Sequence, residues 1–261
     1  MATARKASYE TVRQSYPAWK AYQDQINSPY SYFWDPRAFR LAPFFINHGV
    51  RANTVTLLGL GALICGLVFI VLGAVNTWNY VVGVILLHAV LLLDNIDGHV
   101  ARFTGQTSRL GAPLDDFLTW LQLSLFPVCL GMALFLDDPK PSLLTLGISI
   151  PRSVWLTAGI VQMFVYLLSV VVGRKAEALL GGRAYDKRIA NIKWLIFAKA
   201  LIEIEVPLLA LAALVGAISV LHLGYAVYHT SVLVVVIVRA IQDTARADGQ
   251  SATEDKGPEE K

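Results

Sequence analysis

Long apolar stretches alternate with short polar segments along most of the chain, after about fifty mostly polar residues at the start. Six of these stretches approach the roughly 20 apolar residues that a membrane-spanning helix needs. They cover residues 54–75, 79–104, 113–136, 148–172, 194–218 and 220–241. The pattern predicts an all-α integral membrane protein with six transmembrane helices.

The polar segments divide the chain further. Aromatic and basic residues are mixed just before the first apolar stretch, which predicts an amphipathic helix in the membrane interface, broken at Pro36 and Pro43. The end of the chain is charged and lacks apolar periodicity, so we expect it to be disordered. The predicted parts are a cytoplasmic N-terminal segment (1–29), a juxtamembrane interfacial helix (30–50), a six-span domain (51–242) and a disordered cytoplasmic tail (243–261).

Composition supports the membrane assignment. Hydrophobic residues make up 55% of the chain and charged residues 16%, with a mean hydropathy of +0.53. Soluble domains carry about 25% charged residues, so this chain has too few charges to cover a surface in water. Disorder, collagen and a disulfide scaffold are excluded by the same numbers. Cys65 and Cys129 both lie in apolar runs and fit small buried hydrophobic residues.

Lysine and arginine predict the orientation. They gather before the first stretch, between the second and third, and between the fourth and fifth, whereas the opposite loops hold almost none. The positive-inside rule then places both termini in the cytoplasm, in the cell membrane if the organism is prokaryotic. The net charge of +3 and the pI of 8.8 follow from basic loops that face anionic membrane lipids, and indicate no nucleic-acid partner.

The apolar part of the second stretch is followed by two acids that are predicted to lie deeper in the membrane than a loop would. Its apolar run, from Tyr80 to Leu93, is only fourteen residues long, about 21 Å of helix, whereas the hydrocarbon core is about 30 Å thick. Asp94 and Asp97 therefore enter the hydrocarbon layer, where each charge costs about 2.5–3.5 kcal/mol. Acids at such depth indicate a functional site.

Spacing places these acids together with small residues. Asp94, Asp97, Gly98 and Ala101 occupy positions i, i+3, i+4 and i+7, which share one helix face. Asp115 opens the third stretch after a short loop, so three carboxylates are predicted to converge. Oxygen ligands without nearby histidine or thiol side chains favour Mg²⁺, Mn²⁺ or Ca²⁺ over zinc. Pairing of the acids with basic side chains is the alternative.

These residues carry a resemblance to a known family. Residues 94–102 read DNIDGHVAR, and residues 111–115 read GAPLD after eight intervening residues. The pattern resembles the signature of the CDP-alcohol phosphotransferases, D-x-x-D-G-x-x-A-R followed by G-x-x-x-D-x-x-x-D. Residues 49–56 (GVRANTVT) resemble the stretch that precedes the first span in that family, usually P-N-x-x-T, with Ala52 in place of proline. The resemblance covers roughly residues 30–240.

The resemblance implies a transferase of phospholipid or polar-lipid biosynthesis. Such enzymes move a phosphate-linked alcohol from a CDP-linked donor to an acceptor, here a lipid or a phosphorylated polar molecule, and release CMP. It implies one or two Mg²⁺ or Mn²⁺ ions on Asp94, Asp97 and Asp115, and a homodimer in the membrane lipids. The positions that match nucleotide-binding residues are Asn53, Thr56, Gly98, Ala101, Arg102 and Gly111. For Arg102, a contact to phosphate and a pairing with an acid both stay open.

Thr119 stands where the family has its fourth acid, which serves as general base. General-base catalysis contributes about 10²–10⁴-fold, and a threonine accepts no proton at neutral pH. Three interpretations follow: the acceptor is already ionised, another residue supplies the base, or the chain is a degenerate scaffold that binds nucleotide or lipid without turnover. The candidate substitute bases are Asp116, His99, Glu203 and Glu205. A magnesium-dependent intramembrane prenyltransferase is a further alternative, but residues 173–200 lack the second Asp-rich motif that it requires.

Overall fold

The computed structural model of the protein describes residues 6–18, 31–106, 111–137, 149–179 and 193–254. At some helix ends only the backbone is described, so the side chains of residues 111–116 and 193–203 lie outside the description. The described part contains helices and no strand. In chain order the helices are α1 (Tyr9–Gln14), α3 (Ser31–Asn47), α4 (Ala52–Leu72), α5 (Trp78–Thr104), α6 (Gly111–Asp137), α7 (Arg152–Leu179), α9 (Lys193–Leu214) and α10 (Ile218–Glu254).

Within the described residues, five helices are long and apolar enough to cross a membrane. They are α4, α5, the Phe117–Asp137 part of α6, the Arg152–Lys175 part of α7 and the Ile218–Arg246 part of α10. The fifth predicted stretch is helical as α9, but its apolar portion with described side chains, Ile204–Leu214, is shorter than a span. The all-helical membrane architecture is thus confirmed, whereas the sixth span stays a prediction.

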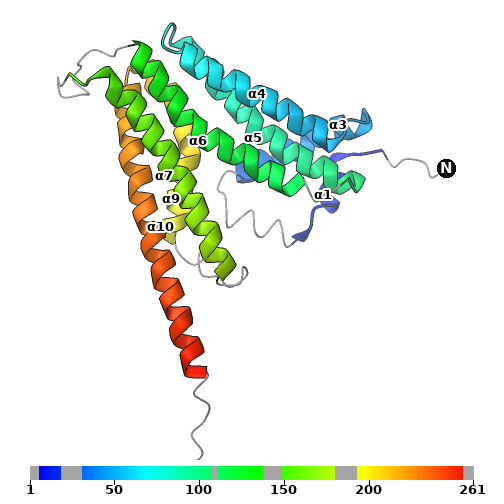
Figure 1. Cartoon of the computed structure of the whole chain (residues 1–261). Helices are drawn as coiled ribbons and strands as arrows, with labels where there is room; N and C mark the ends of the chain where they lie inside the picture. The colour runs from blue at the N-terminus through cyan, green and yellow to red at the C-terminus, as the bar shows by residue number, and fades with distance from the viewer. Residues whose placement is uncertain (1–5, 19–30, 107–110, 138–148, 180–192, 255–261) are drawn as a thin grey trace, which may run out of the picture.

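Helices α4 and α5 form an antiparallel pair, and α6, α7, α9 and α10 stand beside them (Figure 1). An apolar core joins α4, α5, α6 and α9 through fully buried side chains that include Leu63, Leu87, Leu130 and Leu209. Helices α6 and α7 approach closely because glycine lies at their contact: a Cβ on Gly131 would stand 2.5 Å from the carbonyl oxygen of Trp155. Larger residues there would force the helices apart.

A second core lies at the end of the α4–α5 pair that carries the acids. Buried residues of α1 and α3, among them Val12 and Ala38, pack there against Ile96 and Val100 of α5. Helix α5 then ends at Gly105, whose φ of 68° is left-handed and favours glycine. The backbone N–H of Gln106 donates to the carbonyl of Ala101 and closes the last turn. The acidic face therefore lies within two to three turns of a fixed helix end.

Two local expectations were wrong. Pro36 and Pro43 lie inside α3 and do not break it, because apolar packing on α5 and α1 compensates for the backbone hydrogen bonds that proline removes. Helix α10 continues to Glu254, well into the tail that composition predicted to be disordered, and extends beyond the other helices (Figure 1). A helix is present at residues 31–47, but its position in the membrane interface stays a prediction.

Candidate functional site

Asp97 is buried at the contact between α4 and α5. Its side chain is 7% exposed, and the hydroxyl of Thr56 on α4 donates a hydrogen bond of 2.6 Å to its Oδ2. Thr56 lies in the N-x-x-T stretch, and Asp97 lies in the acidic motif 41 residues later. The structure therefore brings together the two sequence segments that carry the family resemblance.

Small side chains allow the two helices to approach at this point. Gly59, one turn after Thr56, faces α5, and a Cβ there would stand 3.8 Å from the Cβ of Leu93. Val55 is fully buried and belongs to the core that Ile96 shares. The register of α4 against α5 is thus set by apolar contacts on either side of the hydrogen bond. Asn53, one turn before Thr56, is exposed at the start of α4.

The other predicted residues of α5 are partly accessible. Asp94, Gly98, Ala101 and Arg102 all have intermediate exposure. Gly98 was expected to leave room for a nucleotide, and the structure gives it a further role. A Cβ on Gly98 would stand 3.0 Å from Nη2 of Arg102, so the glycine leaves space for this guanidinium.

Arg102 is held by residues that the sequence pattern did not identify. Its Nη2 lies 3.1 Å from Nδ1 of His99, and its guanidinium carbon lies 4.8 Å from the ring centroid of Tyr16. A guanidinium only donates hydrogen bonds, so Nδ1 of His99 is the acceptor. Nothing in the spacing of the N-terminal segment indicated that Tyr16 reaches α5.

The second half of the motif is only partly described. Gly111, Asp115 and Asp116 lie at the start of α6, where the side chains are outside the described residues. Among described side chains, no group of three histidine, cysteine or acidic residues converges as a metal site. Thr119 is half-buried, next to the core residue Leu118. The convergence of the three acids therefore stays a prediction.

Two of the four candidate bases, His99 and Glu205, are buried and contact other side chains of the protein. His99 is 2% exposed, stacks on Phe39 with ring centroids 4.0 Å apart, and uses Nδ1 toward Arg102. Glu205 is 3% exposed, and its Oε2 lies 3.4 Å from Nε2 of His229 on α10. Glu203, like Asp116, lies outside the described side chains.

Glu205 lies beside a different core from the acids. Its neighbour Val206 belongs to the apolar core that joins α4, α5, α6 and α9, whereas Ile96, next to Asp97, belongs to the core that α1 and α3 share with α5. The structure therefore does not favour Glu205 as the base.

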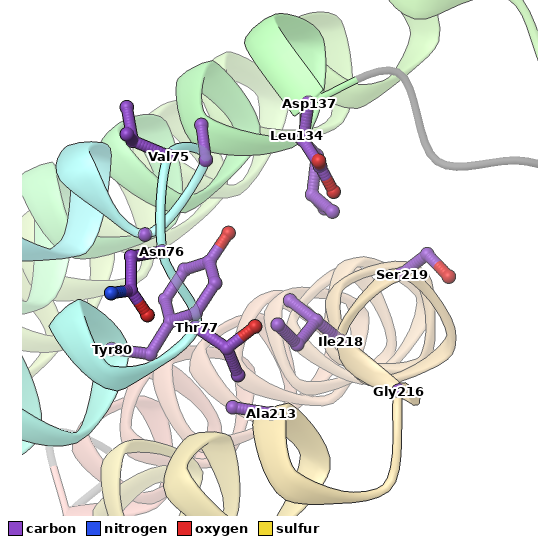
Figure 2. Close-up of a pocket in the computed structure, with 12 residues that line it drawn as sticks. Val75, Asn76, Thr77, Tyr80, Leu134, Asp137, Ala213, Gly216, Ile218 and Ser219 are labelled. Carbon is purple, nitrogen blue, oxygen red and sulfur yellow. The ribbon is translucent and has the colours of Figure 1, made fainter.

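Two cavities lie at opposite ends of α5. One, of about 230 Å³, is lined by the α4–α5 turn, the end of α6 and the α9–α10 turn, around Tyr80 and Asp137 (Figure 2). Tyr80 is seventeen residues, about 25 Å, from Asp97, so this cavity is remote from the acids. The other, of about 890 Å³, lies between α1, the end of α3 and the end of α5. Thr104 lines it, two turns beyond Asp97 on the same helix face.

Comparison with known proteins gives the class of this site. The model of the CDP-alcohol phosphatidyltransferase family matches residues 50–237, which is well over half of the chain. The protein therefore belongs to the CDP-alcohol phosphatidyltransferase family, a family of transferases. The resemblance seen in the acidic motif is confirmed.

Two curated relatives are similar to part of the sequence. Over 78 residues, 30% of each chain, the sequence is 42% identical to a phosphatidylinositol phosphate synthase of Streptomyces avermitilis. Over 63 residues it is 43% identical to an archaetidylinositol phosphate synthase of Aeropyrum pernix, which covers 23% of this chain and 32% of that one. The matches thus span about a third of the length of these relatives. No solved structure matches the chain.

Proposed function

We propose that the protein transfers a phosphatidyl group, or a similar phosphate-linked alcohol, from a CDP-linked lipid donor to a phosphorylated polar acceptor and releases CMP. The observation that carries this proposal is the hydrogen bond between Thr56 and Asp97, which joins the two family segments at a buried carboxylate. Both named relatives synthesise an inositol phosphate lipid. An inositol phosphate is therefore the first acceptor to test.

The acids fit a divalent cation. The donor set consists of carboxylate oxygens, which suit Mg²⁺ or Mn²⁺. Asp97 is oriented by Thr56, as supporting hydrogen bonds orient metal ligands in other proteins. Asp94, Asp97 and Asp115 would hold one or two ions. A bound divalent ion neutralises diphosphate charge and stabilises the leaving group.

The residues of the chain then bind and orient the substrates. The small residues Gly98 and Ala101 leave the acidic face of α5 accessible beside Asp94, and Arg102 lies at the same helix end, where its positive charge binds donor phosphate. The acceptor oxygen attacks the phosphorus that carries the lipid alcohol. A new oxygen–phosphorus bond forms as the bond to CMP breaks, and CMP leaves with the electron pair.

We further propose that the attacking oxygen is ionised before the reaction, as a phosphate oxygen of the acceptor is, so that no proton has to leave when the new oxygen–phosphorus bond forms. Thr119 accepts no proton, Nδ1 of His99 is used by Arg102, and Oε2 of Glu205 faces His229. These contacts favour an ionised acceptor over His99 or Glu205 as the base. A degenerate scaffold, which Thr119 alone supports, binds the donor without forming CMP.

The experiment measures CMP formation by the purified full-length protein in lipid nanodiscs. The donor is radiolabelled CDP-diacylglycerol with Mg²⁺, and the acceptor is inositol phosphate, inositol or none. We expect CMP with inositol phosphate and little with the other two. CMP release with inositol alone would contradict the phosphorylated acceptor. Donor binding without CMP release for any acceptor would favour the scaffold.

A further inference from the structure

The residues before position 50 lie outside the family match, yet α1 and α3, which lie among them, pack on the rest of the molecule. The backbone N–H of Ala7 donates to Oδ1 of Asn47, and Nδ2 of Asn47 donates to the carbonyl of Ala7, both at 2.9 Å. Ser8 and Thr11 form a capping box at the start of α1. These contacts hold α1 against the end of α3.

Aromatic rings extend this contact to the signature helix. Tyr16, just after α1, meets Phe39 of α3 edge-on at 5.3 Å and His99 of α5 edge-on at 5.2 Å. Phe39 stacks on the same imidazole at 4.0 Å. Aromatic pairs prefer such edge-on and stacked arrangements. Tyr16 and Phe39 therefore both contact His99, which lies two positions after the buried Asp97.

Arg102 is enclosed on three sides by this arrangement. The backbone at Gly98 leaves it room, His99 accepts its hydrogen bond, and the Tyr16 ring lies 4.8 Å from its guanidinium carbon. A cation over an aromatic face is attracted by the ring quadrupole, most strongly when partly desolvated. The long side chain of arginine is thereby ordered before a ligand arrives, which reduces the entropy lost on binding.

We propose that Tyr16 is a positioning residue for Arg102, which it holds in the orientation that binds the phosphate of the CDP-linked donor. This inference rests on the proposed function for the identity of that donor. It assigns a role in donor binding to a segment outside the family match. If the N-terminal segment served only for packing, its aromatic residues would all contribute equally to donor binding. Tyr16 differs because its ring contacts both His99 and the guanidinium of Arg102.

The test compares Tyr16→Leu, which removes the aromatic face, with Tyr16→Phe, which keeps it. The matched control is Tyr9→Leu, because Tyr9 also meets Phe39 edge-on, at 6.3 Å, and lies on α1, seven residues before Tyr16. Two quantities are measured in nanodiscs: the dissociation constant of CDP-diacylglycerol, and the KM and kcat of CMP release.

For Tyr16→Leu we expect the donor dissociation constant and the KM to rise by about 3-fold to 30-fold, with kcat changed much less. Tyr16→Phe should restore wild-type values, and Tyr9→Leu should leave them unchanged. Adding Tyr16→Leu to Arg102→Leu should produce no further loss, because both variants remove the same interaction.

Equal effects of Tyr16→Leu and Tyr9→Leu, or unchanged donor binding in Tyr16→Leu, would overturn the inference. Donor binding that depends on Tyr16 without any CMP release would uphold it and refute the proposed transfer. A wild-type protein that binds no CDP-linked donor would refute both.

Discussion

Two polar clusters in this molecule differ in how accessible their side chains are. One lies on a partly accessible helix face, and the other is enclosed between helices. The acid cluster (Thr56, Asp94 and Asp97) lies near the end of α5 among small residues. The α7–α10 cluster (Gln162, Glu205, His222 and His229) combines side chains of α7 and α10 with one acid of α9. In the second cluster His222 is fully buried and uses both ring nitrogens, one toward the Trp155 carbonyl at 3.0 Å and one toward Gln162 at 3.3 Å.

This difference separates a binding role from a structural one. A histidine with both nitrogens engaged inside the protein has no ring nitrogen left for a substrate, and its hydrogen bonds join α10 to α7. Asp97 is a carboxylate beside Gly98, on a helix face whose neighbours are partly accessible. We therefore expect substitutions in the acid cluster to reduce activity and substitutions in the α7–α10 cluster to reduce stability.

The largest effect is expected for Asp97→Asn. Removing this charge from the donor site should lower the rate of CMP release by about 10²–10³-fold, with little change in melting temperature. The matched control is Asp137→Asn, at the other end of the bundle beside the smaller cavity (Figure 2), and it should retain activity. Equal loss of activity in Asp97→Asn and Asp137→Asn would contradict a specific role of the acid cluster in the reaction.

A smaller loss is expected for Thr56→Val, which removes the hydroxyl that donates to Asp97. Because a hydrogen bond to a charged group is worth about 1.5–3 kcal/mol, CMP release should fall by about 10-fold to 150-fold. Thr56→Ser should restore it. Thr54→Val, at an exposed position of the same helix, is the control. Wild-type rates in Thr56→Val would show that Asp97 needs no such support.

A stability effect without an activity effect is expected for His222→Leu. The substitution leaves a buried donor on Gln162 and the buried Trp155 carbonyl without their partner, which costs about 1–3 kcal/mol. The melting temperature should fall by a few degrees while kcat is retained at low temperature. His48→Leu, at an exposed position, should change neither. Lost activity in a well-folded His222→Leu protein would contradict the structural role.

The smallest effect is expected for Thr119→Asp, which restores the acid of the family pattern. If the acceptor is ionised before attack, turnover with inositol phosphate should change by no more than about 2-fold, since a general base then has no proton to remove. The measurement is the steady-state rate of CMP release at saturating substrates. A gain of about tenfold or more would refute the ionised acceptor.

Some of this architecture could be predicted from the sequence, and the reason is physical. The signature acids lie on one helix at spacings of three and four, so their common face follows from helix geometry alone. Apolar length likewise predicted the helices, because the membrane core fixes that length. The family resemblance predicted Thr56 as a nucleotide-binding position, but its hydrogen bond to Asp97 was not predicted.

Contacts between distant segments could not be predicted in this way. Tyr16 and Arg102 are 86 positions apart, and Gln162 and His222 are 60 apart. No periodicity links such residues, because packing of whole helices decides which side chains meet. The prolines of α3 were misread for a related reason: local propensity predicts a break, whereas burial against α5 overrides it.

The most direct test compares the substitution of one acid from each cluster. CMP release from CDP-diacylglycerol and thermal unfolding are recorded for Asp97→Asn and Glu205→Gln in the same nanodiscs. The account predicts that Asp97→Asn loses CMP release and unfolds at the wild-type temperature, whereas Glu205→Gln retains CMP release and shifts the unfolding temperature. Loss of CMP release in Glu205→Gln with unchanged unfolding, together with retained release in Asp97→Asn, would contradict it.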